Sequence, residues 1–111
     1  MTDKIVVLST CATDADAQRI ARTLVEGRLA ACVSIAPGLR SIYRWQGALE
    51  NSEEVLLLIK TSRDLFPALK SELERIHPYE VPEILALPVV EGSGNYLAWV
   101  TANLRPGEPQ R

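Results

Sequence analysis

A run of five apolar residues, Val55-Leu56-Leu57-Leu58-Ile59, constrains the fold of this chain more than any other feature. Successive side chains of a strand point to opposite faces of the sheet, so a strand with one solvated face alternates apolar and polar residues. Here both sets are apolar, and the same holds for Ile5-Val6-Val7-Leu8. Leaving one leucine side chain exposed forgoes about 1.5–3 kcal/mol of burial. A sheet built from these strands therefore needs cover on both faces.

Capping signals and apolar periodicity predict the helices. A helix from Thr13 to Glu26 is predicted because Thr13 can cap it and apolar residues follow at helical spacing, at Ala17, Ile20, Ala21 and Leu24. A second helix is predicted from Asp64, which can cap it, to His77-Pro78, since a residue before proline avoids the helical region. Strands are predicted over residues 4–9, 29–35, 41–45 and 54–61 and within 81–90, and a short helix over 95–104.

The order of these elements predicts an α+β domain. Pro37-Gly38 indicates a bulge within the second strand and Gln46-Gly47-Ala48 indicates a turn, so the middle strands form one long hairpin. The order βαββαβ is that of the ferredoxin-like fold, in which two helices cover one face of a four-stranded antiparallel sheet. We expect one domain over residues 1–104, including the extra C-terminal helix, and a frayed tail over residues 105–111.

The second face of this sheet is expected to be covered by other copies of the chain. Two helices cover one face only, and the C-terminal helix is too short to cover all of the other. A contiguous apolar face of this size marks a partner surface, and the long hairpin adds strand edges that proteins pair or protect. We therefore expect a closed homo-oligomer, although the residues alone do not say how many subunits it has.

Composition argues against several classes of function. The net charge is −2 and the pI about 5.4, without the basic patch that nucleic-acid binding requires. No segment reaches the length of about 20 apolar residues that a membrane span needs. The N-terminus lacks the pattern of a signal peptide, so a cytoplasmic protein with free thiols at Cys11 and Cys32 is expected.

Recognised catalytic signatures are also missing from the sequence. It contains no nucleophile elbow, phosphate-binding loop or dinucleotide fingerprint, so we expect that the chain is not an enzyme. A nucleophilic pair of Cys32 and His77 is the remaining alternative, but burial of a thiol in an apolar strand opposes its ionisation.

Several segments resemble the CutA family of divalent-cation tolerance proteins. They follow one another between Ile5 and Leu104 and are Arg28-Leu29-Ala30-Ala31-Cys32-Val33, Ser41-Ile42-Tyr43-Arg44-Trp45-Gln46-Gly47, His77-Pro78-Tyr79-Glu80-Val81-Pro82-Glu83 and Tyr96-Leu97-Ala98-Trp99. The second and third segments are specific, because neither is a generic turn or strand pattern. The resemblance implies a homotrimer with an architecture like that of PII signalling proteins, and a link to tolerance of copper and other divalent cations.

The candidate metal ligands under this resemblance are Cys32, His77 and a carboxylate, Glu83 or alternatively Glu54. Thiolate favours Cu(I), and imidazole suits copper and zinc. No local ligand cluster exists in the sequence, so these side chains must meet through folding or across subunits. His77 also suits a structural role at a helix end, and Cys32 that of a small buried hydrophobe, so both alternatives stay open.

Four further residues match motif positions of the family and are implied to line a cleft between subunits: Trp45, Glu54, Lys60 and Tyr79. Lys60 ends an apolar strand, where its charge needs a partner, and Glu54, Glu83 or a bound anion is expected. The alternative function is a PII-like signalling or interaction module that binds a small metabolite in these clefts. Trp45 and Tyr79 equally suit packing contacts between subunits.

Overall fold

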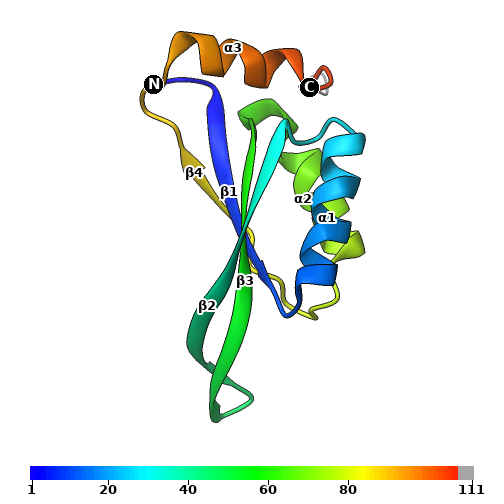
Figure 1. The fold of residues 1–111 in the computed structure, drawn as a ribbon, viewed down its shortest axis with the longest axis vertical. Coiled ribbons are helices and arrows are strands. Elements are labelled where there is room, and N and C mark those ends of the chain that lie inside the picture. Colours follow the sequence, from blue (N-terminus) through cyan, green and yellow to red (C-terminus); the bar gives the residue numbers. More distant parts are fainter. Residues whose placement is uncertain (108–111) are drawn as a thin grey trace.

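Four antiparallel strands form one sheet in the computed structural model of the chain, which describes residues 1–107. The strands lie in the order β2-β3-β1-β4 and comprise β1 (Lys4–Cys11), β2 (Cys32–Trp45), β3 (Ala48–Ser62) and β4 (Leu85–Pro88). The helices are α1 (Asp14–Glu26), α2 (Phe66–Ile76) and α3 (Gly94–Ala102), with a 3-10 helix, η1 (Arg63–Leu65), before α2. The α+β class and the ferredoxin-like order of elements are thereby confirmed (Figure 1).

The ends of α1 and α2 follow from local chemistry. The Thr13 hydroxyl accepts a hydrogen bond from the Asp16 N–H at 3.1 Å, as the capping pattern predicts. The second helix is predicted to begin near Asp64, and α2 begins at Phe66, directly after η1. The predicted cap is not formed, and the Asp64 carboxylate instead accepts from the Ser62 hydroxyl. His77 ends α2 with an extended backbone, as expected for a residue before proline.

The hairpin of β2 and β3 is longer than the sequence indicates and extends beyond the rest of the molecule (Figure 1). Its register shifts between Ala36 and Leu39, which confirms the bulge at Pro37-Gly38. Gln46 and Gly47 have φ values of 50° and 82°, and two successive positive φ angles are typical of a tight hairpin turn. Because residues 48–53 are mostly polar, no apolar alternation indicates that they continue β3.

One face of the sheet packs against α1 and α2 and forms the core. Leu57 and Ile59 of β3 lie beside Val7 of β1 and are fully buried. Ile20 and Leu24 of α1 meet them, together with Leu65, Leu69 and Leu73 from the segment that contains η1 and α2. The residues of the apolar run that point toward the helices are thus buried within the chain.

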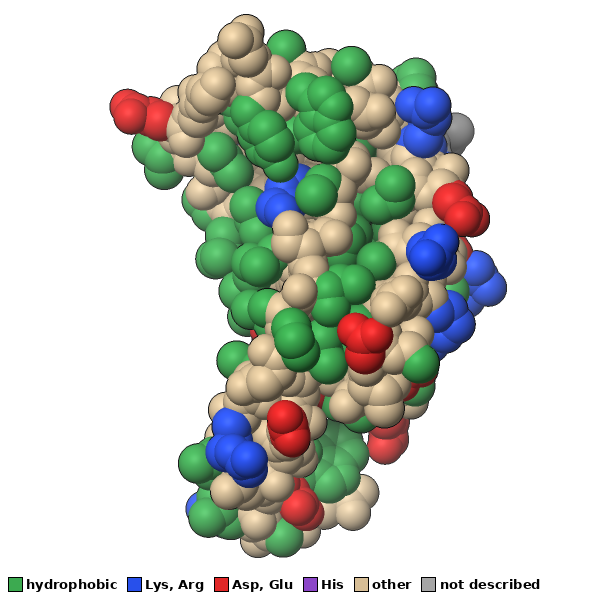
Figure 2. All heavy atoms as spheres, viewed as in Figure 1, with side chains coloured by type: hydrophobic (Ala, Val, Ile, Leu, Met, Phe, Trp, Pro, Cys, Tyr) green, Lys and Arg blue, Asp and Glu red, His purple; other side chains and the backbone are tan. Residues whose placement is uncertain are grey.

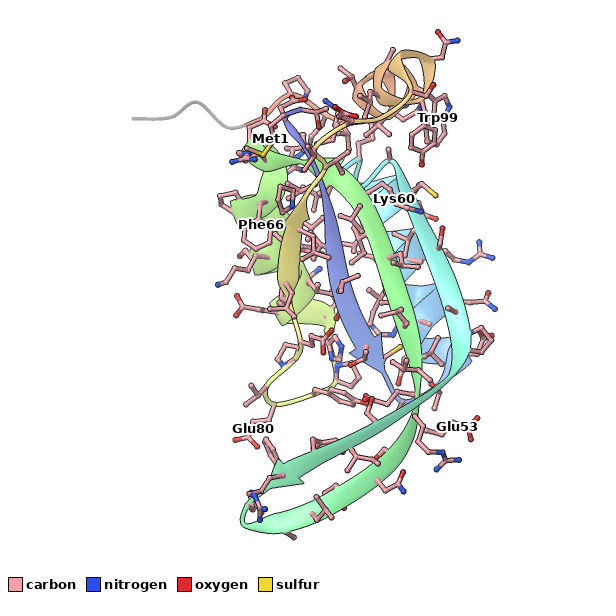
Figure 3. The ribbon with its side chains drawn as sticks, turned by 90° about the vertical axis from the view of Figure 1, so that its left-hand side faces the viewer. Met1, Glu53, Lys60, Phe66, Glu80 and Trp99 are labelled. Carbon is pink, nitrogen blue, oxygen red and sulfur yellow. The ribbon has the colours of Figure 1, made fainter. Side chains whose placement is uncertain are left out.

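The opposite face of the sheet is uncovered over residues 1–107, and we call it the open face. Its apolar residues are Val6, Leu8, Leu56, Leu58, Leu85 and Leu87. Leu85 and Leu87 of β4 are 55% and 47% exposed. In Figure 3 this face is turned toward the viewer, with α1 and α2 behind it, and in Figure 2 it is seen from the side, with hydrophobic side chains along the left margin of the molecule. The residues of the run that point to this face, Leu56 and Leu58, are not covered by any other described element of a single chain.

Helix α3 lies across one end of the sheet rather than over the open face (Figure 1). Only Val100 of this helix is buried, while Tyr96 and Trp99 are exposed and stack with their ring centroids 5.7 Å apart. No helix in the described part of the chain is long and apolar enough to span a membrane.

The predicted tail is described only in part. Residues 108–111 lie outside the described residues, and the Arg105 N–H donates a hydrogen bond to the Arg28 carbonyl at 3.0 Å.

Truncation of Leu57 tests the core. Leu57→Ala removes a fully buried side chain, so the free energy of unfolding should fall by about 2–5 kcal/mol. Val25→Ala on the outer surface of α1 is the control, and its effect should stay within about 0.5 kcal/mol. Urea unfolding followed by circular dichroism at one fixed protein concentration measures both. Equal losses in the two variants would contradict this description of the core.

Candidate functional site

Six of the seven predicted site residues divide into two groups on the chain, and His77 belongs to neither. Glu54 and Lys60 both lie on β3 and on the same face of the sheet, because their positions in the strand differ by an even number. Six residues of a strand span about 20 Å. Cys32 lies beside Lys60, whereas Trp45, Tyr79 and Glu83 lie beside Glu54 around a groove.

The first group, the Cys32 cluster, consists of Cys32, Ser34 and Lys60. The Lys60 ammonium donates to the Ser34 hydroxyl at 2.7 Å and approaches the Cys32 sulfur at 3.8 Å. The expected partners of Lys60, Glu54 and Glu83, form no ion pair with it, and within residues 1–107 no other carboxylate does. The cluster therefore presents a half-buried positive charge and a thiol at one end of the open face.

The second group lines a groove of about 460 Å³ between the outer half of the hairpin and the segment that follows α2. Figure 3 shows this half of the hairpin passing beneath the segment that carries Glu80. The lining contains three carboxylates, Glu54, Glu80 and Glu83, and three aromatic rings, Tyr43, Trp45 and Tyr79. None of its residues is a lysine, arginine or histidine, so the groove is an acidic and aromatic site.

A hydrogen bond between Tyr79 and Glu54 forms the floor of the groove. The Tyr79 hydroxyl donates to the Glu54 carboxylate at 2.7 Å, and Glu54 is only 7% exposed. Burial raises the pKa of Tyr79 above its usual value, and the hydrogen bond to the Glu54 carboxylate raises it further. The phenol therefore stays protonated and remains a donor to the carboxylate well into alkaline solution.

His77 lies behind the groove and holds its loop in place. Its Nε2–H donates to the Thr10 carbonyl at 2.8 Å, and its Nδ1 accepts from the Tyr79 N–H at 3.0 Å. A carbonyl can only accept, so these bonds require the tautomer that carries its proton on Nε2. Both ring nitrogens are thus occupied within the protomer, and His77 positions Tyr79 against Glu54.

The three candidate metal ligands are not brought together in one protomer. Over residues 1–107 the structure contains no group of three or more cysteine, histidine or acidic side chains that could hold a metal ion. Cys32 contacts Ser34 and Lys60, His77 contacts Thr10 and Tyr79, and Glu83 lines the groove. Of the two routes to a metal site, convergence within one chain and assembly across subunits, only the second remains. The nucleophilic pair of Cys32 and His77 is likewise not formed.

Cys11, the other thiol, is a poor candidate for ligation. It is fully buried, and burial together with the nearby charge of Asp16 raises the pKa of its thiol. Since the thiolate is the form that binds metals, Cys32 is the better-placed sulfur.

Sequence reasoning did not identify Tyr43, Glu80 or Thr10 as site residues. Tyr43 lies two residues before Trp45 in β2, so both side chains point to the same face, and the sequence alone indicates this. The role of Thr10 depends on a contact between β1 and the end of α2, which no local pattern contains.

Tyr79 should ionise at unusually high pH. Its folded pKa lies above the unfolded value, so its contribution to stability is present below about pH 10 and is lost as the pH rises further. The difference between the 295 nm titrations of the wild type and Tyr79→Phe isolates this phenol. Its midpoint should lie above that of a free tyrosine and should move down in Glu54→Gln. A midpoint unaffected by Glu54→Gln would contradict the assigned hydrogen bond.

Comparisons with known proteins agree with this fold. A family model described as CutA1 divalent ion tolerance protein matches residues 5–103. The divalent-cation tolerance protein CutA of Thermus thermophilus is 54% identical over 98 residues, which cover 88% of this chain and 95% of that protein. This family is described by tolerance of divalent ions and not by a catalysed reaction.

Solved structures extend the agreement to three dimensions. The Thermus thermophilus divalent cation tolerance protein superposes with a TM-score of 0.89 at 52% identity, covering 92% of this chain and 99% of that chain. CutA of Archaeoglobus fulgidus, described as a periplasmic divalent cation tolerance protein, gives a TM-score of 0.89 at 31% identity and covers 92% of this chain and 99% of its own. The resemblance seen in the sequence is thereby confirmed, and the chain belongs to the CutA1 divalent ion tolerance family.

Proposed function

We propose that the chain works as a homotrimer that binds a divalent cation, copper in the first instance, and so contributes to tolerance of metal ions. The observation that carries the proposal is the open face, which ends in the Cys32 cluster on one side and the groove on the other. Each protomer offers two separate parts of a site, and neither part is complete.

Assembly is supported by the energetics of the open face. Leu56 and Leu58 remain partly exposed in one chain, and Leu58 lies directly opposite Leu8 of the neighbouring strand β1. Because much of each side chain is already covered, complete burial of Leu56 or Leu58 adds only a fraction of the roughly 1.5–3 kcal/mol expected for a fully exposed leucine. Leu85 and Leu87 are about half exposed and add more. The proposed trimer covers this face and forms clefts in which the Cys32 cluster of one protomer meets the groove of another.

Metal binding is supported by the chemistry of the two parts. Cys32 offers a soft sulfur ligand for copper, and the exposed carboxylate of Glu83 offers an oxygen ligand. In His77 only Nδ1 lacks a proton and could bind a metal, and this nitrogen accepts the hydrogen bond from the Tyr79 N–H. His77 would therefore join the site only if that hydrogen bond broke. The metal is therefore proposed to lie between subunits, with Cys32 and Glu83 as its first ligands.

The cytoplasmic location stays a prediction, because the Archaeoglobus fulgidus relative is described as periplasmic.

Sedimentation velocity tests the assembly. At micromolar concentration the molar mass of the wild type from sedimentation should be three times the chain mass of 12.2 kDa. Leu58→Asp places a charge in the middle of the open face and should dissociate the trimer, because a buried unpaired charge is costly. Val25→Asp on α1 adds the same charge away from this face and should leave the trimer intact. A stable wild-type monomer would refute the proposal.

Calorimetric titration tests the metal site. The wild-type trimer should bind Cu(II), or Cu(I) in the absence of oxygen, with a dissociation constant below about 1 mM. Cys32→Ser should weaken binding at least about tenfold, because it replaces a soft ligand by a hard one. Cys11→Ala is the control and should bind as the wild type does.

Two results would contradict the metal site. The first is wild-type binding no tighter than millimolar, and the second is an equal loss in both cysteine variants. In the first case, an anionic metabolite that binds the wild type but not Lys60→Ala would favour the alternative signalling function.

A further inference from the structure

We propose that the groove binds a small organic cation of the alkylammonium type, in addition to the metal site proposed above. The groove volume of about 460 Å³ falls in the range of small-molecule sites in proteins. Three features of its lining indicate a cation that is larger than a metal ion.

The first feature is a buried carboxylate without a counter-charge. Glu54 is 93% buried, and its partner is the neutral hydroxyl of Tyr79. Within residues 1–107 no lysine, arginine or histidine forms an ion pair with it. A buried charge is costly unless it is paired, so the groove is prepared for a positive charge from outside the protomer.

The second feature is the aromatic lining. Tyr43, Trp45 and Tyr79 surround the same space as Glu54, and the face of an aromatic ring attracts an organic cation. An alkylammonium group gains both from this attraction and from the removal of its methyl groups from water. A strongly hydrated metal ion gains from neither.

The third feature is the spacing of the acidic groups. Glu54, Glu80 and Glu83 line one groove, yet they form no group that could hold a single metal ion. Carboxylates arranged around a wider space stabilise a diffuse charge at longer distance. Figure 3 shows Glu80 on the segment above the hairpin, and its carboxylate adds a further negative charge to the groove lining.

Calorimetry with choline and its neutral analogue 3,3-dimethyl-1-butanol tests the proposal on the full chain. The two compounds have nearly the same shape and differ in the positive charge. Choline should bind at least about tenfold more tightly than the alcohol, because cation–π attraction and the Glu54 charge act only on choline. Equal affinities, or no binding of choline, would overturn the proposal.

Two matched pairs of variants locate the site. Glu54→Gln should weaken choline binding at least about tenfold, whereas Glu53→Gln, the next residue on the opposite side of β3, should not. Trp45→Leu on the hairpin should weaken it as well, and Trp99→Leu on α3 should not. The tryptophan pair keeps the test decisive should Glu54→Gln fail to fold, since Trp45 lies outside the core. Equal effects within both pairs would overturn the assignment.

Two further variants separate this proposal from competing occupants. Cys32→Ser should retain choline binding even where it loses copper, so that the two proposals fail independently. Lys60 of a neighbouring subunit is the rival occupant of the groove. If Lys60→Ala bound choline and the wild type did not, the Lys60 ammonium of a neighbouring subunit would be the group that fills the groove. That result would overturn the proposal.

Discussion

The structure depends on a strand that is apolar on both of its faces. In β3, Leu57 and Ile59 complete the core with α1 and α2, while Leu56 and Leu58 project to the open face. The two helices cover only the first set, because both lie on one side of the sheet (Figure 3). The strand therefore links folding of the protomer to its association. Polar residues in the first set would destabilise the core, and polar residues in the second would weaken association.

The candidate groove depends on a chain of contacts that begins in the backbone of β1. The Thr10 carbonyl fixes the ring of His77, the ring accepts the Tyr79 N–H, and the Tyr79 hydroxyl reaches Glu54. The His77 ring and the Glu54 carboxylate are both buried, so each needs the partner that this chain of contacts supplies. A histidine in a cation-tolerance family is readily taken for a ligand, yet here its two nitrogens are used to position a tyrosine.

Local patterns predicted most of the fold and about half of the arrangement of the site. Periodicity, the Thr13 cap and Pro78 identified α1 and α2, since these signals act within a few residues. The cap expected from Asp64 is not formed, since its carboxylate accepts from Ser62, a local contact that a capping pattern does not reveal. The division of the site into two groups followed from strand register and from the bending of the hairpin, which depend on contacts far apart in the chain.

The two charges of the site stand at opposite ends of one apolar surface. Lys60 is held by the Ser34 hydroxyl and Glu54 by the Tyr79 hydroxyl, so each charge has a neutral partner and lacks an opposite charge within the described protomer. Apolar contact strengthens association without fixing one orientation, whereas the two charges favour an alignment in which each meets an opposite charge. A surface that binds the open face must therefore match an apolar centre, an anionic end and a cationic end, and this requirement limits which copies, ions or small molecules can occupy it.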